Sequence, residues 1–254
     1  MYDVLFAEGY GVDALVTDFD STLTVNNTTP GVMEIIYRHA EEPDTTREEM
    51  GELVGAYFAE KREAIEGGGN MEEMLERWSR VERKYSAIIA SYFTGVTREE
   101  MKEEGYSVEL REHAGQVVEH LREAGVSVAV DTNNWSSSLV TAALEDRVSV
   151  DDVYANTLVY GDDDACTGEM IFDNVDPLAK RDALLDYKQK SGARQVAYVG
   201  DDLNDLACIV AADIAFAIKP SDELLDAIQN YGLEDQVRVV ESWDEIEVAL
   251  RSDE

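Results

Sequence analysis

Short apolar runs bounded by turn residues occur near the start of the chain and repeatedly in its second half. They cover residues 14–19, 126–130, 153–155, 196–199 and 214–218. Runs of this length predict buried parallel strands. Helical patterns lie between several of them, at 115–124 and 178–190. The alternation predicts an α/β fold with a doubly wound, mostly parallel sheet, which binds its ligand at the carboxyl ends of the strands.

Residues 26–111 show helical periodicity instead. Two apolar stripes have the spacing of one helix face: Met50, Leu53, Val54, Tyr57, Phe58 and Ile65, then Met71, Met74, Leu75, Trp78, Val81, Tyr85, Ile88, Ile89 and Tyr92. Capping-box spacing predicts helix starts at Thr45 with Glu48, Asn70 with Glu73, and Thr97 with Glu100. We therefore predict a helical cap at 26–111, inserted between core segments 1–25 and 112–254, with both stripes packed in its core.

The segment 156–176 carries neither pattern. It contains Tyr160, Gly161, Gly168 and an acidic run at 162–164. Turn residues of this kind between short apolar stretches predict a small β-hairpin flap.

Two acidic segments follow predicted strands. In LVTDFDSTLT the first strand delivers Asp18 and Asp20, and in VAYVGDDLND another ends at Asp201, Asp202 and Asp205. Residues two apart on a strand share a side, so Asp18 and Asp20 are expected to point to one place. If the two strands are neighbours, several carboxylates converge, and they cannot all stay ionised without a cation. Magnesium prefers such oxygen ligands and commonly combines them with a substrate phosphate.

Two further positions offer hydrogen-bond donors. Thr132, with Asn133 beside it, follows the strand at 126–130, and Lys180 opens the helix before the second acidic segment. A phosphoryl group in transfer needs donors for its equatorial oxygens. Separately, the threonine could be a turn residue and the lysine a surface charge.

The order of these segments resembles the four motifs of the haloacid dehalogenase superfamily of phosphohydrolases. The segments DFDSTL, VYANTL with CTGEM, and GDDLND are most similar to its phosphoserine phosphatase branch. The resemblance implies a phosphatase with Asp18 as nucleophile and Asp20 as general acid and base. It implies Thr132, Asn133 and Lys180 as phosphate binders. The carboxylates considered as ligands of Mg²⁺ are Asp18, Asp20, Asp201 and Asp205, with Asp205 either a ligand or a residue that orients the metal-bound waters.

The substrate is less defined than the chemistry. Phosphoserine phosphatases usually place a glutamate shortly after the first motif, where it meets the substrate ammonium, but here that stretch reads VNNTTPG. Phosphoserine is the leading candidate among small phosphorylated metabolites. Alternatives are a nucleotide or sugar phosphatase, or a phosphotransferase or mutase on the same fold. Tyr57, Phe58 or Trp78 could stack on a nucleotide base, although their helical spacing favours core packing. A non-catalytic binding module fits poorly, because every catalytic position holds a competent residue.

Charge restricts the partners. The 254-residue chain has 21 basic and 55 acidic side chains, a formal net charge of −34. Non-specific nucleic-acid binding is therefore not expected. The acids are spread among apolar residues, which indicates a folded protein adapted to a salty cytoplasm rather than a disordered acidic tail.

No membrane or redox function is indicated. The N-terminal stretch MYDVLFAEGYGVD lacks a basic segment followed by a long apolar one, so we expect a cytoplasmic protein without a membrane partner. Cys166 and Cys208 have no CxxC spacing, which argues against zinc and disulfide roles. We expect a monomer or homodimer.

The charge generates a stability prediction. Self-repulsion of a compact body carrying −34 is screened only when the Debye length falls to about 3 Å, near ~1 M salt. The melting temperature should rise steeply with potassium or sodium chloride up to the molar range. A melting temperature independent of salt would contradict this.

Overall fold

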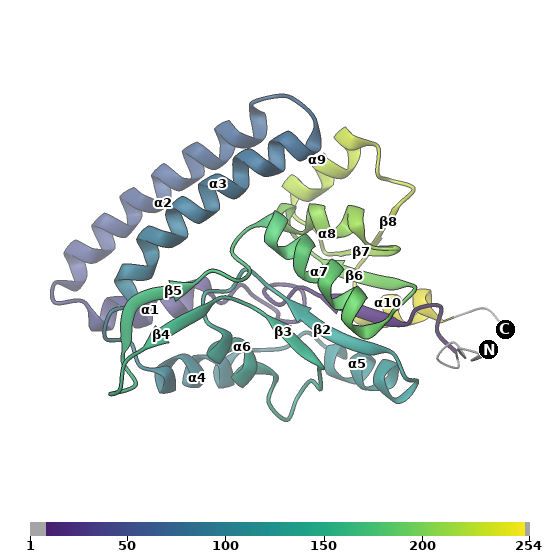
Figure 1. Cartoon of the computed structure of the whole chain (residues 1–254), viewed down its shortest axis with the longest axis horizontal. Helices are drawn as coiled ribbons and strands as arrows, with labels where there is room; N and C mark the ends of the chain where they lie inside the picture. Colours follow the sequence, from purple (N-terminus) through teal and green to yellow (C-terminus); the bar gives the residue numbers. More distant parts are fainter. Residues whose placement is uncertain (1–8, 252–254) are drawn as a thin grey trace.

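The computed structural model describes residues 9–251, and its centre is a six-stranded parallel sheet (Figure 1). In spatial order the strands are β3 (Asp152–Tyr154), β2 (Ser127–Asp131), β1 (Ala14–Thr17), β6 (Val196–Gly200), β7 (Ile214–Ile218) and β8 (Val237–Val240). The predicted fold class is confirmed. Strand β8 was missed, because its sequence VRVV is short and interrupted by an arginine.

Helices cover both faces of the sheet. From α5 onward the helical elements are α5 (Ala114–Glu123), α6 (Ser137–Leu144), α7 (Pro177–Ser191), η2 (Leu203–Asp205), α8 (Leu206–Ala211), α9 (Asp222–Tyr231) and α10 (Trp243–Leu250). Side chains alternate along β1: Leu15 joins the core beneath α5 and α10, whereas Ala14 and Val16 join the core that contains residues of α7, α8 and α9. The sheet is thus buried on both sides, as its continuous apolar strands predict.

Helices alone fill the stretch between the strands β1 and β2. Before α5, they are α1 (Thr29–His39), α2 (Pro43–Glu66), α3 (Met71–Ala90), η1 (Ser91–Phe93) and α4 (Arg98–Ser107). Figure 1 shows α2 and α3 as a long antiparallel pair outside the sheet. We call α1, α2 and α3 the cap helices.

Two of the three predicted capping boxes are present. The side chains of Asn70 and Thr97 each accept a hydrogen bond from the backbone N–H three residues on. The carboxylates of Glu73 and Glu100 in turn accept from the backbone N–H of Asn70 and Thr97. The predicted start at Thr45 is wrong. Helix α2 begins at Pro43, because proline fits the first turn, where its missing N–H costs no hydrogen bond.

The predicted hairpin forms as β4 (Thr157–Tyr160) and β5 (Cys166–Ile171), which pair antiparallel and lie against α3 and η1. Helix α4 packs on α6, so the last helix within the predicted cap segment lies on the core. The exact cap limits, 26–111, stay a prediction. The first eight residues, within the stretch considered for a leader, lie outside the described residues.

Only part of the apolar stripe from Met50 to Ile65 is buried in the core. Met50 is buried, but Phe58 is 52% exposed. Leu53, Val54, Tyr57 and Phe58 line an apolar cavity of about 540 Å³ between α1, α2 and α3. The prediction that this stripe packs in the core is wrong for the residues at the cavity. Helical periodicity identifies an apolar face of a helix but does not show whether other side chains cover that face. No helix in residues 9–251 has the length and apolarity needed to cross a membrane.

The close approach of α4 to α6 depends on Gly105. A methyl group there would lie 2.9 Å from Ala142 Cβ and closer still to the carbonyl oxygen of Leu139. We expect Gly105→Ala to reduce the free energy of unfolding by about 1–3 kcal/mol. Gly51→Ala is the matched control, because that helical glycine faces open space. The control should be neutral or stabilising by up to about 1 kcal/mol in denaturant titration; equal losses in both variants would contradict the packing account.

Candidate active site

Strand β1 places Asp18 at the carboxyl edge of the sheet. The strand is fully buried, and the Asp18 N–H continues its ladder by donating to Val199 O at 2.8 Å. The chain then turns, with the N–H groups of Leu23 and Thr24 both donating to Phe19 O at 3.0 Å. A nucleophile candidate is therefore held by two neighbouring strands rather than by a loop.

Lys180 contacts this aspartate directly. Its ammonium, with 0% of the side chain exposed, donates to Asp18 Oδ1 at 2.7 Å and to Asp205 Oδ1 at 2.6 Å. Burial by itself lowers the pKa of Lys180, but the two carboxylates raise it well above its usual value. Burial raises the pKa of Asp18, and Lys180 opposes that shift. The lysine is thus a buried cation, not the surface charge that its sequence context allowed.

Asp18, Asp201 and Asp205 form the acidic group of the site. One oxygen from each lies within 4.8 Å of the others. Burial, reinforced by the charge of Asp205, raises the pKa of Asp201 to about 7, while Thr22 Oγ1 donates to Asp201 Oδ1 at 2.8 Å and lowers it. Clustered carboxylate oxygens of this kind suit Mg²⁺.

Asp205 differs from the other two carboxylates. Its oxygens accept from Lys180 Nζ, from the Tyr198 hydroxyl at 2.7 Å and from the N–H groups of Asp201 and Asp202 at 2.8 and 3.1 Å. All these donors are protein groups, and the side chain is fully buried. The geometry suits orientation of the loop that carries Asp201.

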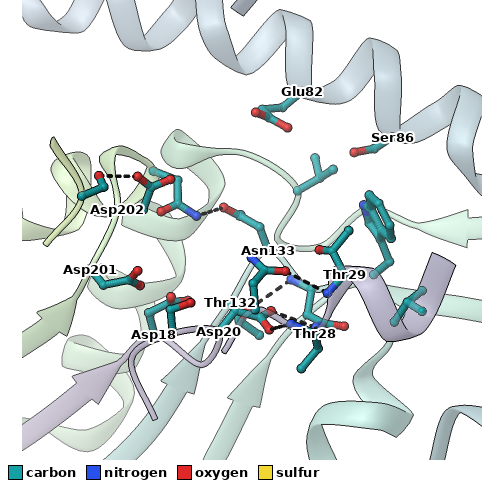
Figure 2. Close-up of a pocket in the computed structure, with 18 of the residues that line it drawn as sticks. Asp18, Asp20, Thr28, Thr29, Glu82, Ser86, Thr132, Asn133, Asp201 and Asp202 are labelled. Atoms are coloured by element: carbon teal, nitrogen blue, oxygen red, sulfur yellow. Dashed lines mark hydrogen bonds between the residues drawn. The ribbon is translucent and has the colours of Figure 1, made fainter. Parts of the chain in front are cut away.

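Asp20 does not stand beside Asp18 on a strand as expected, because β1 ends at Thr17 and Asp20 lies in the following turn. Its carboxylate accepts from Thr28 N–H at 2.7 Å and from Asn134 Nδ2 at 3.0 Å (Figure 2). Burial raises its pKa, and those hydrogen bonds oppose the rise. Asp20 is not in the group of three carboxylates, so its role as a metal ligand stays a prediction.

Thr132 and Asn133 lie in the loop after β2. Thr132 is buried, and its hydroxyl accepts from Asn134 N–H at 3.2 Å. The Asn133 amide donates to Asn174 O at 2.9 Å and accepts from Asn204 Nδ2 at 3.1 Å. Both predicted phosphate binders line the same cavity as Asp18.

Sequence reasoning missed several groups that hold the site. Thr22 contacts Asp201, Asn134 contacts Asp20, and Asn174 binds the backbone carbonyls of Thr132 and Tyr154 at 3.0 and 3.1 Å. The only signal for Thr22 was its place within DFDST. Asn174 had none, because a lone asparagine in a loop does not show which loop it binds.

A cavity of about 440 Å³ joins these residues to the cap. Asp18, Asp20, Asp201 and Asp202 line it from the core, as the convergence of the two acidic segments predicts. Tyr57, Lys61, Trp78, Glu82 and Ser86 line it from the cap helices. In Figure 2, Glu82 and Ser86 lie on the helix above the aspartates. The cavity is therefore lined on one side by core residues and on the other by residues of the cap helices.

This arrangement belongs to a known class of enzyme. The family model for haloacid dehalogenase-like hydrolases matches residues 12–213. The chain therefore belongs to that hydrolase family, and the predicted membership is confirmed.

A phosphoserine phosphatase of Halobacterium salinarum is 35% identical over 118 residues, which cover 44% of this chain and 54% of that relative. The match spans about half of the relative. A solved phospho-aspartyl intermediate analogue of phosphoserine phosphatase has a TM-score of 0.62 at 21% identity, with 94% of this chain and 99% of that chain covered. Cytosolic 5'-nucleotidase IIIB bound to cytidine has a TM-score of 0.64 at 17% identity, with 93% and 85% covered. The structural likenesses concern the fold.

The pKa of about 7 for Asp201 generates a prediction for metal affinity. A carboxylate must lose its proton to bind a cation, so magnesium affinity should fall as the pH drops below 7, by roughly tenfold per pH unit. Thr22→Val should weaken binding by a further ~10-fold, because the lost hydrogen bond favoured the charged carboxylate. Calorimetric magnesium titrations at several pH values measure both effects; an affinity independent of pH and of Thr22 would contradict them.

Proposed function

We propose that this protein is a magnesium-dependent phosphatase that hydrolyses a small phosphomonoester through an aspartyl-phosphate intermediate on Asp18. The observation that carries the proposal is the contact of Asp18 with Lys180, beside Asp201, at the floor of the cavity. A nucleophile, a cation and a metal-suited carboxylate pair are the parts that phosphoryl transfer needs. Family membership supports the hydrolase class.

Different residues of the chain have different roles in the proposed reaction. The Asp18 carboxylate attacks phosphorus, and the new P–O bond forms as the ester P–O bond breaks. Lys180 stabilises the charge on the phosphoryl oxygens together with Thr132 and Asn133. Asp20 gives its proton to the leaving oxygen and then takes one from the water that hydrolyses the aspartyl phosphate. Its raised pKa favours the protonated form needed first.

Asp18 and Asp201 would hold the magnesium ion, because their oxygens are close and not all of them are engaged by protein donors. When bound, the ion offsets the repulsion between the carboxylate nucleophile and the phosphate dianion. Asp205 would orient the Asp201 loop from behind.

Phosphoserine is the leading substrate. The relative from Halobacterium salinarum is named a phosphoserine phosphatase, and cap helices line one side of the cavity. A nucleotide is the second candidate. The adjoining apolar cavity of about 540 Å³ includes Tyr57, Phe58 and Tyr85, so it could receive an aromatic base. The protein named 5'-nucleotidase shares the fold.

The net charge of the chain suggests the salt concentration in which the protein works. With a net charge of −34, we propose a cytoplasm of high salt as the working environment, with the chain a monomer or a homodimer.

The assigned roles make distinct predictions for two variants. Asp18→Asn should abolish turnover, because an amide is not a nucleophile for phosphorus. Asp20→Asn should retain phosphate binding and lower kcat by ~10²- to 10⁴-fold. Steady-state rates on p-nitrophenyl phosphate at molar salt measure both. A near-wild-type rate in either variant would remove that residue from its role.

The hydrolase and transferase alternatives differ in their products. With magnesium and no acceptor, we expect inorganic phosphate to be released from a phosphomonoester, and chelation should stop it. Turnover that needs a second sugar would identify a phosphotransferase or mutase. Full activity in the metal-free protein would contradict the magnesium requirement.

A further inference from the structure

Glu82 on α3 has one carboxylate oxygen occupied and one open. Its Oε1 accepts from the Tyr57 hydroxyl at 2.5 Å and from Trp78 Nε1 at 2.6 Å. No described residue donates to its Oε2. The carboxylate lines the cavity and, in Figure 2, lies on the helix that faces the aspartates. Two neutral donors thus fix its orientation and leave an acceptor facing the space where a leaving group would sit.

Glu82 has no direct ion-pair partner among the described residues, and Lys61 acts on its carboxylate only at longer range. Lys61 is the one lysine or arginine among the described residues that line this cavity, and its ammonium pairs with Glu223 of α9 at 2.9 Å. The same ammonium lies 4.9 Å from the centre of the Trp78 ring. No described residue forms a salt bridge with Glu82. A carboxylate removed from water is costly unless it is paired or protonated, and burial raises the pKa of Glu82. A cationic ligand at the open Oε2 would stabilise the charged form.

The segment after the Asp20 turn, which also lines the cavity, has no carboxylate that could bind an ammonium group. Asn27, Thr28 and Thr29, which follow the Asp20 turn, line the cavity and are neutral. Among the described lining residues, Glu82 is the only acid that comes from the cap helices. An ammonium on the leaving group would therefore find its carboxylate on α3 and not in the loop after β1.

We propose that Glu82 Oε2 binds the ammonium group of an amino-acid leaving group and so selects phosphoserine over analogues without that charge. The proposal rests on the proposed phosphatase function and names the residue that sets its specificity. Tyr57 and Trp78 act as positioning residues, because they contact Glu82 Oε1 and leave Oε2 to the substrate.

The test compares phosphoserine with phosphoglycerate, in which a hydroxyl replaces the ammonium. In Glu82→Gln the side chain keeps its shape and loses its charge. We expect kcat/KM for phosphoserine to fall about 10- to 100-fold, as for a lost charge-assisted hydrogen bond. For phosphoglycerate we expect a much smaller change, so the preference between the two substrates should collapse. Glu76→Gln is the matched control, because Glu76 lies exposed on the same helix.

Three outcomes would overturn the proposal. Glu82→Gln could lower kcat/KM equally for both substrates, which would indicate a structural role. It could leave the preference for phosphoserine intact. The wild-type protein could prefer phosphoglycerate or a cytidine monophosphate to phosphoserine, in which case the leaving group carries no ammonium while Asp18 chemistry stands.

A binding measurement separates this proposal from the proposed function. If the wild-type protein hydrolyses no phosphomonoester, calorimetric titration with phosphoserine and phosphoglycerate still tests the subsite. Tighter binding of phosphoserine that is lost in Glu82→Gln would support Glu82 without any turnover. Equal binding of both ligands by the wild-type protein would contradict it.

Discussion

The site depends on one buried ammonium group held between two buried carboxylates. Lys180 contacts Asp18 at the end of β1 and Asp205 after β6. An uncompensated charge at this depth is strongly unfavourable, so each of the three groups requires the other two. The triad therefore links α7 to the carboxyl ends of two neighbouring strands and sets the position of the Asp18 carboxylate.

The same triad also fixes the conformation of the surrounding loops. Asp205 accepts the N–H groups of Asp201 and Asp202, which shapes the loop after β6, and Thr22 then contacts Asp201 from the loop after β1. These contacts shape the floor of the cavity from the core, and Thr28 at the start of α1 holds Asp20. The cap helices provide the roof, with Glu82, Lys61 and the aromatic side chains around them. Under the proposed roles, core residues carry the chemistry and cap residues the selectivity.

The sequence predicted the parts of this arrangement that repeat along the chain. Apolar runs identified five of the six strands, and the strand-end acids Asp18 and Asp201 lie together as parallel neighbours require. The turn at Asp20 was not predictable, because it depends on hydrogen bonds from Thr28 and Asn134. Thr28 belongs to no recognised sequence pattern, and Asn134 is far from Asp20 in the chain. The cavity beside Tyr57 was missed for a related reason. Helical spacing identifies an apolar face, but only tertiary packing decides whether another side chain covers it.

The central claim is that the phosphoryl group passes through Asp18. It is tested most directly by mixing the enzyme with magnesium and substrate, quenching in acid within the first turnovers, and locating the phosphoryl group by peptide mass spectrometry. The account predicts a phosphorylated peptide containing Asp18, accumulating further in Asp20→Asn and absent in Asp18→Asn. Turnover with no phosphoryl-enzyme in either the wild type or Asp20→Asn, or with the phosphoryl group on another residue, would contradict it.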